Sequence, residues 1–136
     1  MIIKRVEHIT INVSDIERST KFFRDVLGFA YIETVADGPK DLVYFDIDGS
    51  ARLELFDFHG KAVKSAPVQG GCDPLGYVHA AFMVDSVDEW VARFRENDVT
   101  ISFGPCDLPH LGMRVCLFLD PDGNTLEICE PLKQAG

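Results

Sequence analysis

Residues 120–130 read DPDGNTLEICE and combine a tight turn with a β-strand. The proline presets φ for a turn and the glycine admits positive φ, so the chain is expected to reverse direction here. In the strand that follows, side chains alternate between the two faces of the sheet. Leu126 and Ile128 therefore share one face, and Glu127 lies in mid-strand on the other. A carboxylate in that position lies either on a solvated face or in a polar cavity.

An earlier part of the chain repeats this pattern. Residues 46–49 (DIDG) are again a turn sequence, and the strand that follows them places Glu54 between two leucines. Residues 8–13 (HITINV) are similarly echoed by residues 79–84 (HAAFMV). Repetition at this scale indicates two copies of one supersecondary unit.

Each copy is predicted to run β-α-β-β-β, which makes the chain an α+β protein. The first module covers residues 4–60, the linker 61–76 and the second module 77–131, within a single domain of residues 1–136. The linker segment lacks periodicity and is rich in proline and glycine, as expected for a connection.

The ends of the helices have sequence signatures in both modules. Ser14 and Ser86 are each followed three residues later by glutamate, which is the spacing of a capping box. Gly28 and Asn97 are placed to end the two helices in the left-handed conformation. In the second module, residues 104–112 are predicted to form a loop.

Composition sets limits on function. The chain has 136 residues, of which 46% are hydrophobic, which is enough for a core of one domain. Its net charge of −9 argues against nucleic acid or an anionic membrane as a partner. We find no apolar run long enough to span a membrane and no signal peptide, so a cytoplasmic location is expected. The four cysteines show no C-x-x-C spacing and are expected to be reduced.

The repeat singles out four polar residues as a candidate metal site. His8, Glu54, His79 and Glu127 each lie in a predicted strand, on the face opposite the helices. Two imidazoles and two carboxylates on one concave surface suit a divalent ion such as Ni, Co, Zn, Fe or Mn. Alternatively, each is an isolated polar residue on an exposed face, although isolated residues have no reason to recur at matching places in both copies.

With these motifs, the chain resembles the vicinal oxygen chelate superfamily and, within it, glyoxalase I. The resemblance covers Val6 to Glu130 and includes the DPDGN-T-L-E ending. It implies two βαβββ modules in a cupped mixed sheet around one divalent metal ion per site, with Ni, Co or Zn expected first. It also implies that the metal ligands fall on His8, Glu54, His79 and Glu127.

Two positions depart from the bacterial glyoxalases that the chain resembles. Those proteins carry an Arg and an Asn that hold glutathione, and the matching positions here are Asn12 and Phe58. Without a cation to pair with the thiol's carboxylate, the resemblance supports the reaction class more strongly than glutathione as the thiol.

The implied reaction is a lyase or isomerase step on a 2-oxoaldehyde thiol adduct, through an enediolate. A metal ion would act as Lewis acid, and Glu127 or Glu54 would be the base. The alternatives are a metal-dependent epimerase, an extradiol-type dioxygenase, or a small-molecule binding or resistance protein. A homodimer is expected, with each site taking two ligands from each subunit.

Three further residues are weaker candidates. His110 could border the cavity, although a solvated loop histidine is the more common case, and Arg52 and Arg114 could orient an anion or form surface salt bridges. His59, at a strand end, receives no role.

Overall fold

The computed structural model describes residues 1–63 and 75–133. The chain divides into two compact units, Met1–Pro67 and Val68–Gly136, and each is described here by itself. The boundary between the units falls within the linker indicated by the sequence.

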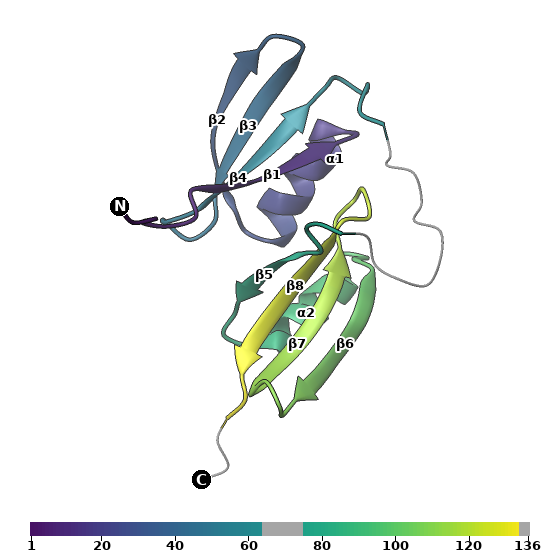
Figure 1. The fold of residues 1–136 in the computed structure, drawn as a ribbon. Coiled ribbons are helices and arrows are strands. Elements are labelled where there is room, and N and C mark those ends of the chain that lie inside the picture. The colour runs from purple at the N-terminus through teal and green to yellow at the C-terminus, as the bar shows by residue number, and fades with distance from the viewer. Residues whose placement is uncertain (64–74, 134–136) are drawn as a thin grey trace. The chain divides into compact units, whose positions relative to one another are not determined.

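The first unit is a four-stranded mixed sheet with one helical segment (Figure 1). In the order β1-β4-β3-β2, the parallel pair is β1 with β4, and the other pairs are antiparallel. Its elements are β1 (His8–Val13), α1 (Ile16–Lys21), the π-helical turn η1 (Phe22–Val26), β2 (Ala30–Asp37), β3 (Lys40–Asp46) and β4 (Arg52–Asp57).

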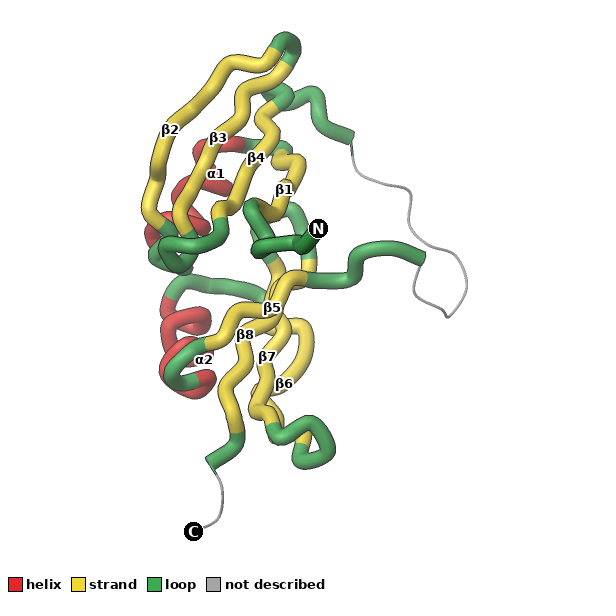
Figure 2. The backbone as a smooth tube through the Cα atoms, turned by 60° about the vertical axis from the view of Figure 1, so that its left-hand side comes forward, coloured by secondary structure: helices red, strands yellow, loops and turns green. Residues whose placement is uncertain are grey.

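The second unit has the same topology. Its strand order is β5-β8-β7-β6, with β5 parallel to β8 and the remaining pairs antiparallel. Figure 2 shows in each unit a helix on one face of its own sheet. The predicted α+β fold of two βαβββ units is confirmed. The elements of this unit are β5 (Ala80–Met83), α2 (Val87–Glu96), β6 (Ile101–Leu108), β7 (Met113–Leu119) and β8 (Thr125–Pro131).

Each unit has its own apolar core between helix and sheet. In the first, Phe23, Phe45 and Leu55 are almost fully buried. In the second, the rings of Phe94 and Phe118 lie 4.3 Å apart between centroids and are both fully buried. The alternation of buried and polar side chains along the strands leaves the opposite face of each sheet free for the polar residues of the repeat.

The helix ends differ in part from the sequence prediction. Ser86 caps α2 as predicted, and its side chain accepts from the Glu89 amide at 3.3 Å. The cap of α1 is Asp15 rather than Ser14, and its carboxylate accepts from the Arg18 amide at 3.0 Å. A charged oxygen is a stronger acceptor for that amide than a hydroxyl, which explains the shift by one residue. At the end of α2, positive φ occurs at Asp98 (54°) and not at Asn97.

The prediction of a loop over residues 104–112 was wrong for its first half, because β6 continues to Leu108. The register of β6 against β7 shifts twice, which disguises the strand in the sequence. Gly104 lies at this irregular point with φ of 81°, and a Cβ there would approach the Val115 carbonyl oxygen to 2.7 Å. The absence of a side chain at Gly104 therefore allows β6 and β7 to pack closely.

Two further sequence expectations concern thiols and membranes. Cys106, Cys116 and Cys129 are free thiols, and burial raises the pKa of the last two. Cys72 lies outside the described residues. Within the described residues, none of the helices has the length and apolar character needed to cross a membrane.

Candidate metal site

Glu54 is a buried carboxylate on the open face of the first sheet. Its residue exposure is only 5%. The strand register places Thr10 of β1 and Tyr44 of β3 directly beside it, one on each side. The Thr10 hydroxyl donates to Glu54 Oε2 at 2.6 Å, and the Tyr44 hydroxyl donates to Oε1. The hydrogen bond to Glu54, together with burial, raises the pKa of Tyr44 to about 12, so Tyr44 remains a donor at neutral pH.

His8 lies next to this carboxylate. Its Nε2 is 3.6 Å from Glu54 Oε2, and its Nδ1 contacts the Glu7 carboxylate. The hydrogen bond with His8 lowers the pKa of Glu7, and the charge of Arg52 adds to this effect. Because an ionised carboxylate can only accept, His8 donates through Nδ1, and in the neutral imidazole Nε2 is then the nitrogen with a free lone pair.

The second unit brings together the other two predicted residues. His79 Nε2 lies 2.9 Å from Glu127 Oε2, and the two side chains are 31% and 17% exposed. His79 was predicted to lie in a strand but immediately precedes β5, which begins at Ala80. It still lies beside Glu127, because the parallel register pairs Ala81 with Glu127.

Both pairs have donor atoms and spacings that suit a divalent ion. Two ligand atoms about 2.1 Å from one ion lie about 3.0 Å apart at right angles and about 3.4 Å apart at a tetrahedral angle. The observed separations of 3.6 Å and 2.9 Å are close to these values. Each unit thus offers one imidazole and one carboxylate in reach of an ion. That all four bind one ion remains a prediction.

Comparison with known proteins identifies the family of the chain. Residues 5–128 match the sequence model of the Glyoxalase/Bleomycin resistance protein/Dioxygenase superfamily. The chain belongs to this superfamily. Its relatives include the metallothiol transferase FosB of Staphylococcus epidermidis, which is 30% identical over 93% of this chain and 83% of FosB.

Solved structures from the superfamily include both enzymes and binding proteins. The trypanothione-dependent glyoxalase I of Leishmania major is 27% identical, with a TM-score of 0.74, covering 94% of this chain and 87% of that one. TnmS3, an antibiotic-binding protein from Streptomyces sp. CB03234, is 26% identical, with a TM-score of 0.74, covering 96% of this chain and 98% of that one. Superfamily membership therefore establishes the fold and leaves the choice of reaction to the site.

The two positions that depart from bacterial glyoxalases lie at one end of the open face in this superfamily member. Asn12 pairs in register with Phe56, and Phe58 follows β4. The Phe56 and Phe58 rings meet edge to face at 6.4 Å, and Lys40 Nζ lies 4.9 Å from the Phe56 centroid. An aromatic surface with a nearby cation thus occupies this end of the sheet.

His59, which the sequence analysis left without a role, contacts two aspartates. Its Nε2 lies 3.8 Å from Asp41 and its Nδ1 3.4 Å from Asp57. Asp41 and Asp57 face each other across β3 and β4, where two like charges would repel, so the imidazole supplies a polar neighbour for both. Asp57 is three residues from Glu54 in the same strand and therefore points to the opposite face. This cluster, which also has metal-ligand chemistry, is separate from the predicted site.

The predicted arginine candidates are engaged in ion pairs. Arg114 binds Asp88 and Asp107, each at 2.7 Å, and Arg52 binds Glu7 at 2.6 Å. Both arginines thus form the salt bridges that the sequence analysis gave as the alternative. His110 is exposed in the turn after β6.

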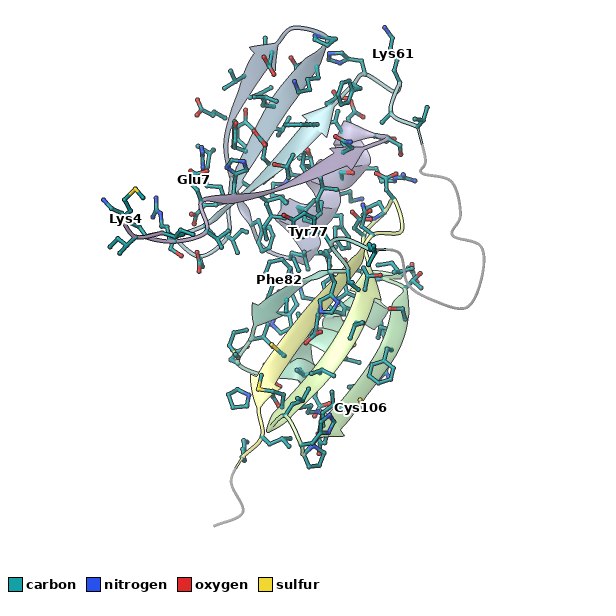
Figure 3. All side chains as sticks on the ribbon, viewed as in Figure 1. Lys4, Glu7, Lys61, Tyr77, Phe82 and Cys106 are labelled. Atoms are coloured by element: carbon teal, nitrogen blue, oxygen red, sulfur yellow. The ribbon has the colours of Figure 1, made fainter. Side chains whose placement is uncertain are left out.

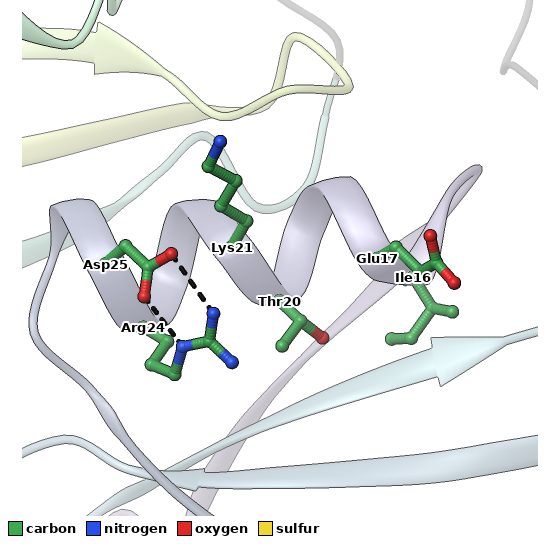
Figure 4. Close-up of a pocket in the computed structure, with 6 residues that line it drawn as sticks. All are labelled: Ile16, Glu17, Thr20, Lys21, Arg24 and Asp25. Carbon is green, nitrogen blue, oxygen red and sulfur yellow. Dashed lines mark hydrogen bonds and ion pairs between the residues drawn. The ribbon is translucent and has the colours of Figure 1, made fainter.

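A surface pocket of the first unit lies along the outer side of its helical segment and contains none of the predicted ligands (Figure 4). Arg24 and Asp25 form an ion pair across it at 2.7 Å. The pocket is lined by Ile16, Glu17, Thr20, Lys21, Arg24 and Asp25.

Sequence reasoning missed the residues that support Glu54 and His8. These residues are Thr10, Tyr44 and Glu7. Thr10 has a detectable signal, because it lies two residues after His8 and so shares its face. Tyr44 and Glu7 become visible only when the strand register is known.

Proposed function

We propose that the chain is a metal-dependent lyase or isomerase of the glyoxalase I type, acting on a 2-oxoaldehyde thiol adduct or a similar small α-hydroxycarbonyl compound. The observation that carries this proposal is one His–Glu pair at the same place in each unit, His8 with Glu54 and His79 with Glu127. Nitrogen and oxygen ligands of this kind suit Ni, Co or Zn, with Fe or Mn as alternatives.

The surroundings of the two glutamates support different roles. Both oxygens of Glu54 accept hydrogen bonds from hydroxyl groups, which hold the carboxylate still. Among the described residues, the only side chain that forms a hydrogen bond or ion pair with the Glu127 carboxylate is His79. We therefore assign Glu54, His8 and His79 to holding the ion and Glu127 to moving the proton.

The proposed reaction transfers a proton between adjacent carbons. A divalent ion, when bound, supplies a Lewis acid that makes the carbon-bound hydrogen next to the carbonyl more acidic. Glu127 takes this proton and returns it to the neighbouring carbon, as a general base and then a general acid. The Glu54 carboxylate keeps its position and its negative charge during the transfer, while Glu127 gains and then loses the proton.

The open face around Asn12 and Phe58 supports a thiol other than glutathione. This end of the sheet presents the rings of Phe56 and Phe58 with Lys40 beside them. Lys40 also pairs with Asp37, which reduces the charge available to a ligand carboxylate. We expect a thiol adduct with a larger apolar part to be preferred over the glutathione adduct.

A second candidate function is transfer of a thiol to an electrophile. The identity of 30% with a metallothiol transferase over 93% of this chain favours it. The same donor set would hold the ion in this case, and no carbon-bound proton would move. The two functions therefore differ in the fate of one hydrogen atom.

The test begins with purified protein loaded separately with Ni²⁺, Co²⁺ and Zn²⁺. Methylglyoxal is supplied with glutathione or with another small thiol in D₂O, and product is followed by NMR. A 2-hydroxy thioester is the expected product, with the transferred hydrogen on its hydroxyl-bearing carbon and deuterium there only to the extent that the proton on Glu127 exchanges with solvent. With an epoxide supplied in place of methylglyoxal, a hydroxy thioether product would favour thiol transfer, because the sulfur bonds to carbon as the ring C–O bond breaks and the oxygen takes up a proton. Failure to bind any divalent ion would contradict both and would favour a binding protein such as TnmS3.

We also propose that the chain forms a homodimer in which each site takes one His–Glu pair from each subunit. An inactive His8→Ala chain mixed with an inactive Glu127→Ala chain then carries one intact site per mixed dimer. About a quarter of wild-type activity is expected after random reassociation, because half of the dimers are mixed and each has one working site of two. A monomer in light scattering, or no recovery, would contradict the shared site.

A further inference from the structure

Glu7 belongs to a closed ring of contacts in the first unit. It lies just before β1, where Figure 3 labels it. His8 Nδ1 donates to Glu7, and His8 Nε2 lies 3.6 Å from Glu54 Oε2. The Tyr44 hydroxyl donates to the other oxygen of Glu54, and Arg52 Cζ lies 4.4 Å from the Tyr44 ring centroid. The ring closes where Arg52 binds Glu7 at 2.6 Å.

The backbone holds Glu7 in this position as well. Its carbonyl oxygen accepts from the Arg52 amide at 2.9 Å, which extends the pairing of β1 and β4 by one residue. Glu7 is thus held by its main chain to the strand that carries Glu54, while its side chain reaches His8. This arrangement leaves the imidazole little freedom to rotate.

We propose that Glu7 is a positioning residue that selects Nε2 of His8 as the metal ligand and aims it at the ion. This inference rests on the proposed function, because it assumes that His8 and Glu54 hold a metal. A carboxylate that accepts from one ring nitrogen fixes the tautomer and makes the other nitrogen a better ligand. We call the His–Glu pair of each unit a half-site. Glu7 therefore fixes the orientation of His8 in the half-site of the first unit before an ion binds.

The second unit lacks this support. The residue before His79 is Val78, which is 61% exposed and whose side chain cannot accept a hydrogen bond. Among the described residues, no acceptor contacts His79 Nδ1, and His79 Nε2 binds Glu127 directly. The first half-site is thus arranged for binding, whereas in the second an ion must replace the contact between imidazole and carboxylate.

The experiment measures the tautomer and the metal affinity separately. Histidine-labelled, metal-free protein is examined by two-bond ¹H–¹⁵N correlation at about pH 8, above the ordinary pKa of histidine. Wild-type His8 is expected to carry its proton on Nδ1, and Glu7→Ala is expected to lose this preference. Zn²⁺ affinity, measured by competition with a chelator, should fall about 10- to 100-fold in Glu7→Ala. Glu7→Gln retains an acceptor oxygen and should recover part of the loss.

The control is Glu17→Gln, which removes the same charge from α1 and should leave both measurements unchanged. Because Glu7 is about half exposed, its loss should leave the thermal unfolding midpoint nearly unchanged, which separates positioning from a structural role. A wild-type His8 protonated on Nε2, or a Zn²⁺ affinity of Glu7→Ala within about threefold of wild type, would overturn the proposal. If the wild type binds no ion, the proposed function fails, while the tautomer measurement still tests the contact.

Discussion

The two units share one topology and one pair of ligand types, yet they hold those ligands differently. In the first, Glu54 accepts from two hydroxyls and His8 is supported by Glu7. In the second, the side chains of His79 and Glu127 have only each other as polar partners among the described residues. The proposed division of roles, with Glu54 holding the ion and Glu127 moving the proton, rests on this difference.

The turns that precede the two glutamate strands differ in a similar way. Asp120 is 5% exposed, and its carboxylate accepts from the amides of Asp122 and Asn124 and from the Asn124 side chain. In the first unit, the partly buried Asp46 and the exposed Asp48 share this task. Asp46 accepts from Gly49, and Asp48 accepts from Ser50 and Ala51. In the second unit, one buried carboxylate therefore accepts the hydrogen bonds that two residues divide between them in the first unit.

The largest expected effect separates the two glutamates. Glu127→Gln should lower kcat by about 10²- to 10⁴-fold while most of the metal remains bound, because the amide cannot accept the proton. Glu54→Gln should lose metal, because its charge and both fixed oxygens belong to the ion-holding pair. Metal content by plasma mass spectrometry and kcat, measured on the same samples, distinguish the two. Equal metal loss in both variants would remove the difference between the half-sites.

A smaller effect is expected when the hydroxyls around Glu54 are removed. Tyr44→Phe should weaken metal binding about tenfold, because the Glu54 carboxylate loses one of the two donors that orient it. Thr10→Val should act in the same direction. Tyr31→Phe, which removes an exposed hydroxyl bonded only to Thr34 in the described structure, is the matched control. Chelator competition measures all three, and unchanged affinity in Tyr44→Phe would show that Glu54 needs no such support.

The turn comparison predicts a stability difference. Asp120→Ala removes a buried carboxylate that satisfies three donors and should lower the free energy of unfolding by about 2–4 kcal/mol. Asp48→Ala, on the exposed turn, should have a clearly smaller effect. Urea denaturation of both variants gives the two values. Equal losses would mean that burial of the turn carboxylate is irrelevant.

The smallest effect is a pH dependence of the exposed turn. Hydrogen bonds from the Ala51 amide and then the Ser50 amide lower the pKa of Asp48 below its ordinary value of 3.8. A lowered folded-state pKa contributes stability that is present above the unfolded pKa and is lost as pH falls through the folded pKa. Wild type should therefore exceed Asp48→Asn in stability at about pH 6, and the difference should shrink toward about pH 2. A difference independent of pH would exclude this cause.

Several features of the molecule could be predicted from local sequence rules. Alternation along strands placed Leu126 and Ile128 in the core, where both are at most 3% exposed. The spacing of Ser86 and Glu89 identified the start of α2. Recurrence of the pattern at His8 and His79 indicated two units of equal topology. These features depend on neighbouring residues, whose geometry follows from the periods of strand and helix.

The tertiary structure decided what surrounds the predicted ligands. Tyr44 lies ten residues from Glu54, and Thr10 lies 44 residues away. Only the register of β3-β4 and β1-β4 brings both hydroxyls to one carboxylate. The contact of Arg52 with Glu7, and hence the orientation of His8, depends on the same register. The sequence by itself determined the chemical types of the candidate ligands and the face of the sheet on which they lie, because alternation is local. The different numbers of hydrogen bonds around the two half-sites depend on strand pairing. Residues far apart in the sequence can form these bonds only once the register of the paired strands is fixed.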